Sequence, residues 1–577
     1  MYTASRLKSR SSGTGSTRFF CWMTVLVALS TALGMKEASA QAVPPTVEPG
    51  RIEERFEAPK RPRSAIEPVV PPAERALPPG EAGKIRFALA GVVVEGSTVY
   101  KDSDFLRFYE HHLGKEISLA DVYGIAAAIT AKYRNDGYIL SQVIVPPQHI
   151  RGGIVRLRVI EGFINQVIIK GEILGSSALL RSYAGKIERS RPLRVGELEH
   201  YLLLANDLPG VSVRSVLVPS ETQPGASDLI LEVTQDNFDG FVSFDNRGTE
   251  FIGPHQLYYG LAFNSAFGLF ERTDLRFIHA LPPKELRFGQ LMHEIPLGAE
   301  GTKAIFSVNH SRSEPGDDLK PLEFENRNTA VSLTLIQPFI RSRTQNLLMR
   351  AGITARRSES EILGERLTED RLRIATFGFT YDFADRLRGV TLLDVGLSQG
   401  LDIFGETKTG SPNLSRENGK SDFTKVTAEL SRLQHLFSEL SLFMSFQGQY
   451  GGSQLLASEE FGVGGGQFGR AYDPSEIVGD HGIALKAELR LDQPFGLRAA
   501  RGVQLYAFYD FGAVWNRATS GGGRRESLAS AGGGVRLNIT DMISGHLEIA
   551  VPLTRGVAAR GGDGDDPRLF FGVVMRF

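Results

Sequence analysis

Apolar and polar residues alternate in the stretch Ala330-Val331-Ser332-Leu333-Thr334-Leu335. Successive side chains of a β-strand point to opposite faces, so the valine and both leucines share one face, and the serine and threonine share the other. Residues 373–381 and 423–433 follow a similar pattern. Between residues 237 and 577 such segments are separated by turns rich in Gly, Asn, Asp and Pro, and no long amphipathic helix is evident.

A closed barrel in a membrane accounts for this pattern. A transmembrane strand needs about 9–11 residues, so sixteen strands use roughly 160 residues and leave the rest for turns and long loops. We therefore predict a transmembrane β-barrel of about sixteen antiparallel strands over residues 237–577. The arithmetic also permits nearby even strand numbers, and an array of soluble β-sandwiches is the alternative.

The overall composition excludes two classes of protein. The 577 residues include 65 Lys and Arg against 66 Asp and Glu, and a net charge of -1 offers no field to attract a nucleic acid. Beyond the first forty residues there is no run of eighteen apolar residues, which excludes transmembrane helices from the mature chain. We expect neither a nucleic-acid partner nor a helical membrane domain.

The first forty residues have the features of a secretory signal peptide. Basic residues precede the apolar stretch 19–33, and Ala38-Ser39-Ala40 provides a cleavage site of small residues. We predict a signal peptide over residues 1–40, with an N-terminal membrane anchor as the alternative. The single cysteine, Cys21, lies inside this segment, so the exported chain could form no disulfide bond and no thiolate metal site.

Residues 41–83 are predicted to form a proline-rich arm or linker. Proline lacks an amide donor and favours extended backbone in the residue before it. Within the arm, residues 51–56 (Arg-Ile-Glu-Glu-Arg-Phe) could form one or two helical turns. From the residues alone we expect this fragment to be solvated.

A compact α/β module is predicted next, over residues 84–162. An extended run at 87–95 precedes two helical stretches. The second of these is the clearer, because Ser118 and Asp121 have the spacing of a capping box. Two strands then follow, at residues 139–145 and 154–160.

A second module, over residues 163–236, repeats the same architecture. Residues 164–169 are predicted to be extended and residues 193–204 helical, and two strands follow at 211–218 and 229–233. The recurrence is one of element order more than of sequence letters.

No catalytic motif is evident along the chain. Residues 464–469 match G-x-G-x-x-G formally, but no helix or βαβ unit follows them, so we expect a flexible transition from barrel to loop. Phosphate-binding, zinc-protease and nucleophile-elbow motifs do not occur, and the 11 histidines are scattered. We therefore predict that the protein is not an enzyme and has no cofactor or metal site.

Two segments of the predicted barrel stand out. Residues 468–482 are too rich in turn-forming residues to be a strand and read as a long loop, whereas Asp510 interrupts the otherwise apolar strand 506–515. An acid facing lipid would be costly, but Asp510 facing the lumen could accept a bidentate hydrogen bond from an arginine on an inward-folded loop. Arg470 is the natural candidate. The alternative is a solvated Arg470 and a different partner for Asp510.

Taken together, the residues resemble the outer-membrane transporters of two-partner secretion, of the hemolysin secretion/activation type. The first module resembles a polypeptide-transport-associated (POTRA) domain through Gly137-Tyr138 and residues 155–162, and the second module is similar through residues 208–211. Two stretches of the barrel also resemble the family, Asp245-Asn246-Arg247-Gly248 with Gly253, and residues 337–343 with Asn346-Leu347.

The most specific part of the resemblance is the loop. The family carries an Arg-Gly-aromatic motif in a loop folded into the barrel, and this arginine meets an acid on the barrel wall. The corresponding loop residues are Arg470, Ala471 and Tyr472, with alanine in place of the glycine. The wall motif corresponds to Asp510, Phe511 and Gly512. The family's plug helix would fall near residues 51–56.

The resemblance implies a pore that moves one large unfolded exoprotein from the periplasm to the cell surface without ATP. The implied partners are this secreted client, captured by POTRA domains in the periplasm, and the lipid of the outer membrane, with periplasmic chaperones as further candidates. Three alternatives stay open from the sequence: an outer-membrane assembly factor of the same superfamily, a passive or gated solute porin, and an outer-membrane enzyme.

Overall fold

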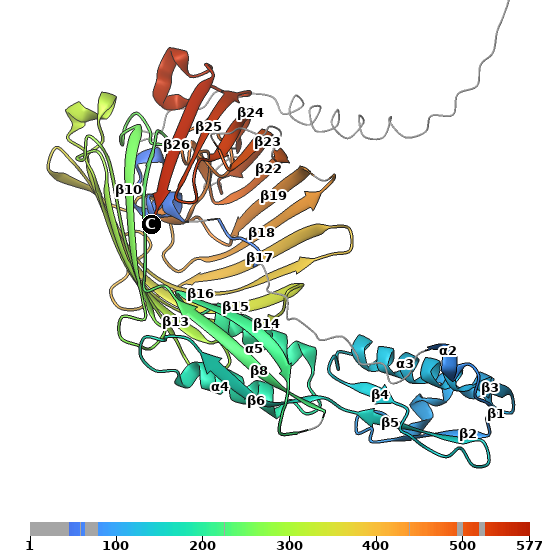
Figure 1. Cartoon of the computed structure of the whole chain (residues 1–577). Helices are drawn as coiled ribbons and strands as arrows, with labels where there is room; N and C mark the ends of the chain where they lie inside the picture. The colour runs from blue at the N-terminus through green and yellow to red at the C-terminus, as the bar shows by residue number, and fades with distance from the viewer. Residues whose placement is uncertain are drawn as a thin grey trace, which may run out of the picture. The chain divides into compact units, whose positions relative to one another are not determined.

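The computed structural model describes residues 45–57, 59–63, 79–223, 225–437, 439–492, 500–517 and 525–577 (Figure 1). The predicted signal peptide, residues 1–40, lies outside the described residues together with Cys21, and so does the stretch 64–78 of the proline-rich arm. Among the described helices, none combines the length and apolar character needed to cross a membrane.

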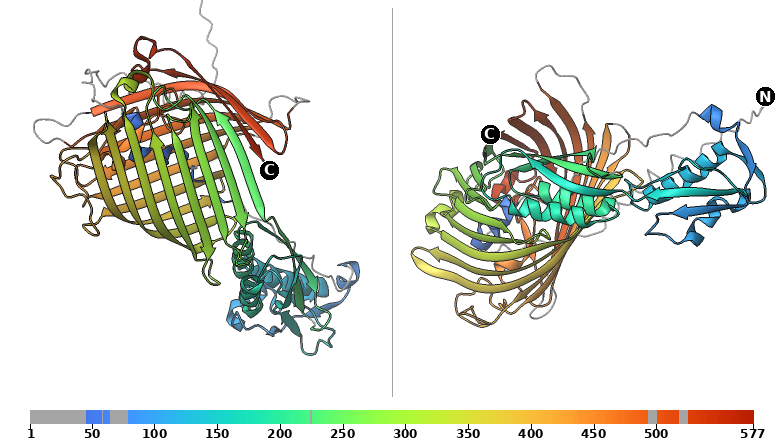
Figure 2. Two further views of the ribbon diagram at one scale, coloured as in Figure 1. Left: turned by 90° about the vertical axis from the view of Figure 1, so that its left-hand side faces the viewer. Right: turned by 60° about the horizontal axis from the view of Figure 1, so that its bottom comes forward.

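Sixteen antiparallel strands close into a barrel, seen from the side in Figure 2. Neighbours in sequence pair with each other, except that β19 pairs with β22 across a long loop and β26 closes the ring against β9. The strands are β9 (Phe238–Asp245), β10 (His255–Asn264), β11 (Arg272–Leu281), β12 (Arg287–Pro296), β13 (Lys303–Ser313), β14 (Glu325–Arg341), β15 (Gln345–Ile362), β16 (Glu365–Ala384), β17 (Gly389–Gly400), β18 (Thr424–His435), β19 (Leu440–Gly451), β22 (His481–Asp492), β23 (Gly502–Trp515), β24 (Arg525–Asn538), β25 (Ile543–Pro552) and β26 (Arg568–Arg576). The predicted sixteen-stranded barrel is confirmed.

The alternating stretch of the sequence lies in β14 and shows how the barrel faces are assigned. Val331, Leu333 and Leu335 are 39%, 47% and 47% exposed, and they form part of the apolar outer face. Ser332 and Thr334 alternate with them and point to the lumen. A polar lumen and an apolar exterior are what a barrel surrounded by lipid requires.

The first α/β module contains a three-stranded sheet in the order β2-β5-β4, a two-stranded sheet β1-β3 and the long helix α3. Its elements are α2 (Pro79–Ala82), β1 (Arg86–Ala88), β2 (Gly91–Glu95), η4 (Asp102–Asp104), η5 (Leu106–Phe108), η6 (Glu110–His112), β3 (Glu116–Ser118), α3 (Leu119–Asn135), β4 (Gln142–Ile144) and β5 (Ile154–Ile160). The first predicted helical stretch is a series of short 3-10 turns. The predicted strand 139–145 is shorter than expected, because a turn in which the Ser141 amide donates to Tyr138 delays its start.

The predicted capping box at the start of α3 is confirmed. The Asp121 amide donates to Ser118 Oγ at 3.3 Å, and the Ser118 amide donates to Asp121 Oδ2 at 2.8 Å. The hydrogen bonds from the Ser118 amide and hydroxyl hold the pKa of the Asp121 carboxyl below its usual value. The helix therefore starts where the sequence predicts.

The second α/β module has a sheet in the order β6-β8-β7 and two helices. Its elements are β6 (Phe163–Lys170), α4 (Ala178–Arg189), α5 (Val195–Asn206), β7 (Val211–Pro219) and β8 (Ala226–Gln235). The sequence analysis missed α4, in which Leu180, Tyr183 and Ile187 are buried with the spacing of one helical face. A glycine inside this short segment, Gly185, weakens its helical signal.

The start of the arm lies inside the barrel (Figure 1), where Arg51 and Ile52 are buried and Glu54 stays exposed, so the expectation of a solvated fragment at residues 51–56 is wrong for its first two residues. The arm forms the 3-10 turns η1 (Pro45–Val47), η2 (Pro49–Arg51) and η3 (Glu53–Phe56). Asn326 of β14 donates to the Val47 carbonyl at 2.9 Å, and Phe56 packs against the rings of Tyr258 and Phe288. The partners of this short segment lie on distant barrel strands, so its own sequence does not predict its position.

The assignment of faces in β14 predicts that an arginine introduced at position 333 lowers the free energy of unfolding more than one introduced at position 332. Leu333→Arg turns a guanidinium toward lipid and should lower the free energy of unfolding by about 2–4 kcal/mol if it lies near the bilayer midplane. The control Ser332→Arg turns the same group into the lumen, where the cost should be well under ~2 kcal/mol. Urea unfolding in lipid vesicles measures both, and equal losses would contradict the assignment.

Candidate functional site

A long loop between β19 and β22 folds into the barrel and carries the predicted motif. This inward loop, residues 452–480, contains η8 (Ala457–Glu459) and the hairpin strands β20 (Phe461–Val463) and β21 (Ile477–Gly479), which pair antiparallel. Phe461, Val463 and Tyr472 are at least nine-tenths buried and belong to one cluster with side chains of the barrel wall. The G-x-G-x-x-G stretch, residues 464–469, lies inside this hairpin and not at a transition into the barrel.

Arg470 and Asp510 are brought together in the lumen. Arg470 Nε donates to Asp510 Oδ2 at 3.0 Å, and Arg470 Nη2 donates to Asp510 Oδ1 at 3.0 Å. The amides of Gly469 and Arg470 donate to the same Oδ2 at 3.2 and 3.0 Å. Asp510 is completely buried, so its charge is balanced by a bidentate guanidinium and two backbone amides.

Two further carboxylates and one ring complete the surroundings of Arg470. Arg470 Nη1 donates to Glu488 Oε2 at 2.5 Å and lies 3.5 Å from a carboxylate oxygen of Glu548. The guanidinium carbon lies 3.5 Å from the centre of the Phe508 ring, which is a cation–π contact. Burial opposes the charge of Arg470, but the hydrogen bond to Asp510 and the nearby carboxylates raise the pKa of the guanidinium above its usual value.

Ala471 and Tyr472 fit the loop without a glycine in the motif. The backbone φ of Ala471 lies outside the left-handed region, and its carbonyl accepts a hydrogen bond from Arg568 at 3.0 Å. The position that needs glycine is Gly469, with φ +84°, where an added Cβ would lie 2.8 Å from a Leu528 methyl. The Tyr472 hydroxyl lies within hydrogen-bond distance of two carbonyls, that of Ala529 in β24 at 3.1 Å and that of Arg555 in the connection after β25 at 3.0 Å.

The wall motif contributes its aspartate and its glycine, but not its phenylalanine, to this contact. An added Cβ at Gly512 would lie only 2.3 Å from a Val463 methyl, so the absent side chain lets β20 approach the wall. Phe511 lies between Asp510 and Gly512 and therefore points to the opposite face of β23. The aromatic partner of Arg470 is instead Phe508, two residues before Asp510 on the lumen face.

The sequence analysis missed Arg247 as part of the site. This residue follows β9 in the Asp-Asn-Arg-Gly stretch, and its Nη2 donates to Glu548 at 2.5 Å while its Nη1 donates to the Arg470 carbonyl at 3.4 Å. Its guanidinium also lies over the Phe570 ring of β26, 4.1 Å from the centre. Arg247 therefore joins the strands that close the barrel to the inward loop, a link that no spacing in the sequence reveals.

The inward loop also holds the arm. Arg51, with 2% of its surface exposed, donates to the carbonyls of Glu460 and Ala457 at 2.9 and 3.2 Å and to the Ser475 hydroxyl at 3.1 Å. Burial raises the pKa of the Glu460 carboxyl to about 7, although Arg416 and Arg51 oppose this change. Wall, loop and arm thus form one connected set of polar contacts in the lumen.

Comparison with known proteins identifies the family. The sequence model described as haemolysin secretion/activation protein ShlB/FhaC/HecB matches residues 225–537, more than half of the chain. The chain belongs to this family. A model of the ShlB-type POTRA domain matches residues 87–162, within the first module.

Individual relatives are distant but cover most of the chain. The heme/hemopexin transporter protein HuxB of Haemophilus influenzae (strain 86-028NP) is 21% identical over 79% of this chain and 81% of its own. The outer membrane transporter CdiB of Dickeya dadantii is 23% identical over 74% of this chain and 76% of its own. The structure of CdiB from Escherichia coli matches with a TM-score of 0.70 and 20% identity, over 85% of this chain and 91% of that one, which shows the shared fold.

The protein is an outer-membrane transporter of two-partner secretion, with POTRA domains in the periplasm. The family match places it among secretion proteins, and not among assembly factors, solute porins or enzymes. The barrel end that contacts the second module therefore faces the periplasm. The inward loop enters from the opposite end, which faces the cell exterior.

Removal of the Asp510 carboxylate tests the strength of the central ion pair. Asp510→Ala leaves a buried guanidinium without its bidentate partner and should lower the free energy of unfolding by about 3–5 kcal/mol. The control Asp541→Ala removes one partner of the exposed ion pair with Arg501 and should cost less than ~1 kcal/mol. Denaturant unfolding in detergent measures both variants, and similar small losses would contradict the assigned role.

Because Val463 of the loop lies against Gly512 of the wall, we predict that a smaller side chain at position 463 compensates for a larger one at position 512. Gly512→Ala should displace β20 and make the inward loop more sensitive to protease added outside the cell, because its Cβ overlaps a Val463 methyl. The double variant Gly512→Ala, Val463→Ala should regain much of the protection. A Gly512→Ala variant with the protection of the parent would show that β20 does not depend on this contact.

Proposed function

We propose that this transporter moves a large, unfolded exoprotein from the periplasm to the cell surface without ATP. The observation that carries the proposal is the inward loop, which a buried ion pair fixes to the wall of the barrel in a family of secretion proteins. Arg470 and Asp510 hold the loop in its working position, and Tyr472 anchors it to β24 and to the connection after β25. HuxB is named a heme/hemopexin transporter protein, and the client of this chain is a separate question.

The lumen suits an extended polypeptide. Its wall presents polar and charged side chains, such as the Arg350 and Asp394 pair joined by hydrogen bonds of 2.6 and 2.8 Å. Such a lumen can conduct an unfolded chain without matching its sequence. Folding of the client outside the cell then favours movement in one direction.

The periplasmic modules can capture a client by β-augmentation, in which an extended chain adds a strand to a sheet edge. In the second module, side chains already bind the edge strands: Asn206 bonds both backbone groups of Val213, and Glu188 accepts from the Val167 amide. In the first module, β2 is an edge strand and its Val93 is 44% exposed. We propose β2 as the first contact of the client, which periplasmic chaperones would deliver unfolded.

A comparison of proteins in the medium, on the surface and in the outer membrane, with and without the gene, tests this function. The proposal predicts the loss of one or a few large proteins from the surface and the medium. A general fall in outer-membrane barrels, or no change in any secreted protein, would contradict it.

The proposed role of the loop contact predicts a loss of secretion without a loss of barrel. Arg470→Ala and Asp510→Ala should each lower the amount of client outside the cell by about tenfold or more, because the loop is no longer held. The control Asp541→Ala should secrete normally. The folded barrel is quantified by its shifted migration on unheated gels, and normal secretion in both loop variants would overturn the assigned role.

A further inference from the structure

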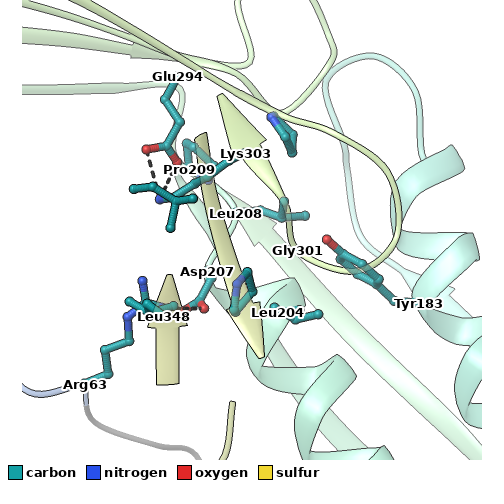
Figure 3. A pocket seen from close by; sticks show the side chains of 13 residues that line it. Arg63, Tyr183, Leu204, Asp207, Leu208, Pro209, Glu294, Gly301, Lys303 and Leu348 are labelled. Carbon is teal, nitrogen blue, oxygen red and sulfur yellow. Dashed lines mark hydrogen bonds and ion pairs between the residues drawn. The ribbon is translucent and has the colours of Figure 1, made fainter. Parts of the chain in front are cut away.

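A pocket lies where the second module meets the periplasmic end of the barrel (Figure 3). It is lined by the end of α5, by the turn between β12 and β13, by parts of β14 and β15, and by the arm. Its lining residues include Arg63, Leu204, Asp207, Ile336 and Leu348. The pocket thus combines two carboxylates, those of Asp207 and Glu294, with apolar walls, and Glu294 already accepts two hydrogen bonds of 2.9 Å from Lys303.

Two cations, Arg341 and Arg63, converge on Asp207. Arg341 of β14 binds it bidentately, with Nε to Oδ2 at 2.8 Å and Nη2 to Oδ1 at 2.9 Å. Arg63 of the arm donates a further hydrogen bond to Oδ2 at 2.6 Å. Arg341 is 3% exposed in its side chain, whereas Arg63 and Asp207 are each 28% exposed. The buried Arg341 of the wall is therefore the permanent partner of Asp207, and the partly exposed Arg63 of the arm is a second partner that can leave.

The same arrangement recurs further along the lumen wall at Asp394. Arg350 binds this carboxylate through both oxygens, at 2.6 and 2.8 Å, and Lys60 of the arm adds a contact of 2.6 Å. Lys60 is 46% exposed in its side chain and Asp394 is 4% exposed. Two basic residues of the arm, three positions apart, thus each bind a carboxylate that already has its own arginine: Asp394 on the barrel wall and Asp207 at the end of α5.

This pairing makes the arm's cations exchangeable. When the arm leaves, Asp207 keeps the bidentate bond to Arg341, so no carboxylate is left without a partner. A partly exposed ion pair contributes little to stability and is screened by salt, so Arg63 can leave at low cost. The contacts of Arg51 differ, because that guanidinium is almost completely buried in the inward loop.

We propose that the Asp207 pocket binds a basic side chain of the extended client, and that Arg63 occupies this site at rest. The carboxylate receives the positive charge, while Leu204, Ile336 and Leu348 contact the aliphatic part of the incoming side chain and its neighbours. The client then replaces the arm at the periplasmic entrance in a direct exchange. This inference rests on the proposed function, and it names the chemistry of the segment that enters the barrel first.

Binding of a short peptide to the full-length transporter in detergent tests the exchange. The probe is a fluorescent peptide with the arm's own sequence from residue 59 to residue 63, Pro-Lys-Arg-Pro-Arg, and its control has glutamine in place of all three basic residues. Arg63→Ala should bind the basic peptide about fivefold or more tightly than the parent, because the site is vacated. The glutamine peptide should show no such gain.

Two second-site variants show whether the gain belongs to this pocket. Adding Asp207→Asn to Arg63→Ala removes the charge, and adding Leu348→Trp fills the pocket while Asp207 keeps its partner. Each double variant should bind the basic peptide no more tightly than the parent does. The Leu348→Trp variant leaves the bond between Asp207 and Arg341 in place, so its loss of binding cannot result from an unpaired Arg341. Equal binding by the parent and Arg63→Ala, or a gain that survives both additions, would overturn the proposal. Because peptide binding is measured without secretion, its failure is distinct from a failure of the proposed function.

Discussion

A guanidinium enclosed in the lumen of the barrel is the interaction on which the site depends. Arg470 is fixed by Asp510 and Glu488 at distances of 2.5–3.0 Å, and it is almost inaccessible to solvent. A buried charge is tolerated only when it is paired and hydrogen-bonded, so this group can occupy essentially one position. Because Arg470 belongs to the inward loop, the ion pair also fixes the position of this loop.

The remaining contacts of the lumen follow from that position. With the inward loop fixed, its carbonyls at Ala457 and Glu460 become acceptors for Arg51, and the start of the arm is held inside the barrel. Arg247 connects the loop to the strands that close the ring. Further along the arm, Lys60 and Arg63 make only partly exposed ion pairs. The arm is therefore held firmly near the loop and weakly near the periplasmic entrance.

Local sequence signals predicted the elements whose causes are local. The alternation at 330–335 identified the barrel, and the spacing of Ser118 and Asp121 identified the start of α3, because both depend on residues a few positions apart. The turn-forming residues of 468–482 predict the loop, an acid in an apolar strand predicts a lumen partner for Asp510, and the family resemblance supports Arg470 as that partner. The burial of Arg51 and Ile52 could not be predicted, since the hydrogen-bond acceptors of the Arg51 guanidinium are all more than 400 positions away. The contact between Arg247 and Glu548, which lie 301 positions apart, could not be predicted for the same reason.

We propose that the docked loop is the working state of the transporter. A disulfide between Val463→Cys and Gly512→Cys tests it most directly. An added Cβ at Gly512 lies 3.0 Å from the Val463 Cβ, so a small outward shift of β20 reaches the roughly 3.5–4.5 Å that a disulfide spans, and Cys21 is the only native cysteine. Secretion of the client is measured with this bond oxidised and reduced. The account predicts that the oxidised protein, with its loop fixed to the wall, still secretes its client. Secretion that stops on oxidation and returns on reduction would show that the loop must leave the wall, and would contradict the account.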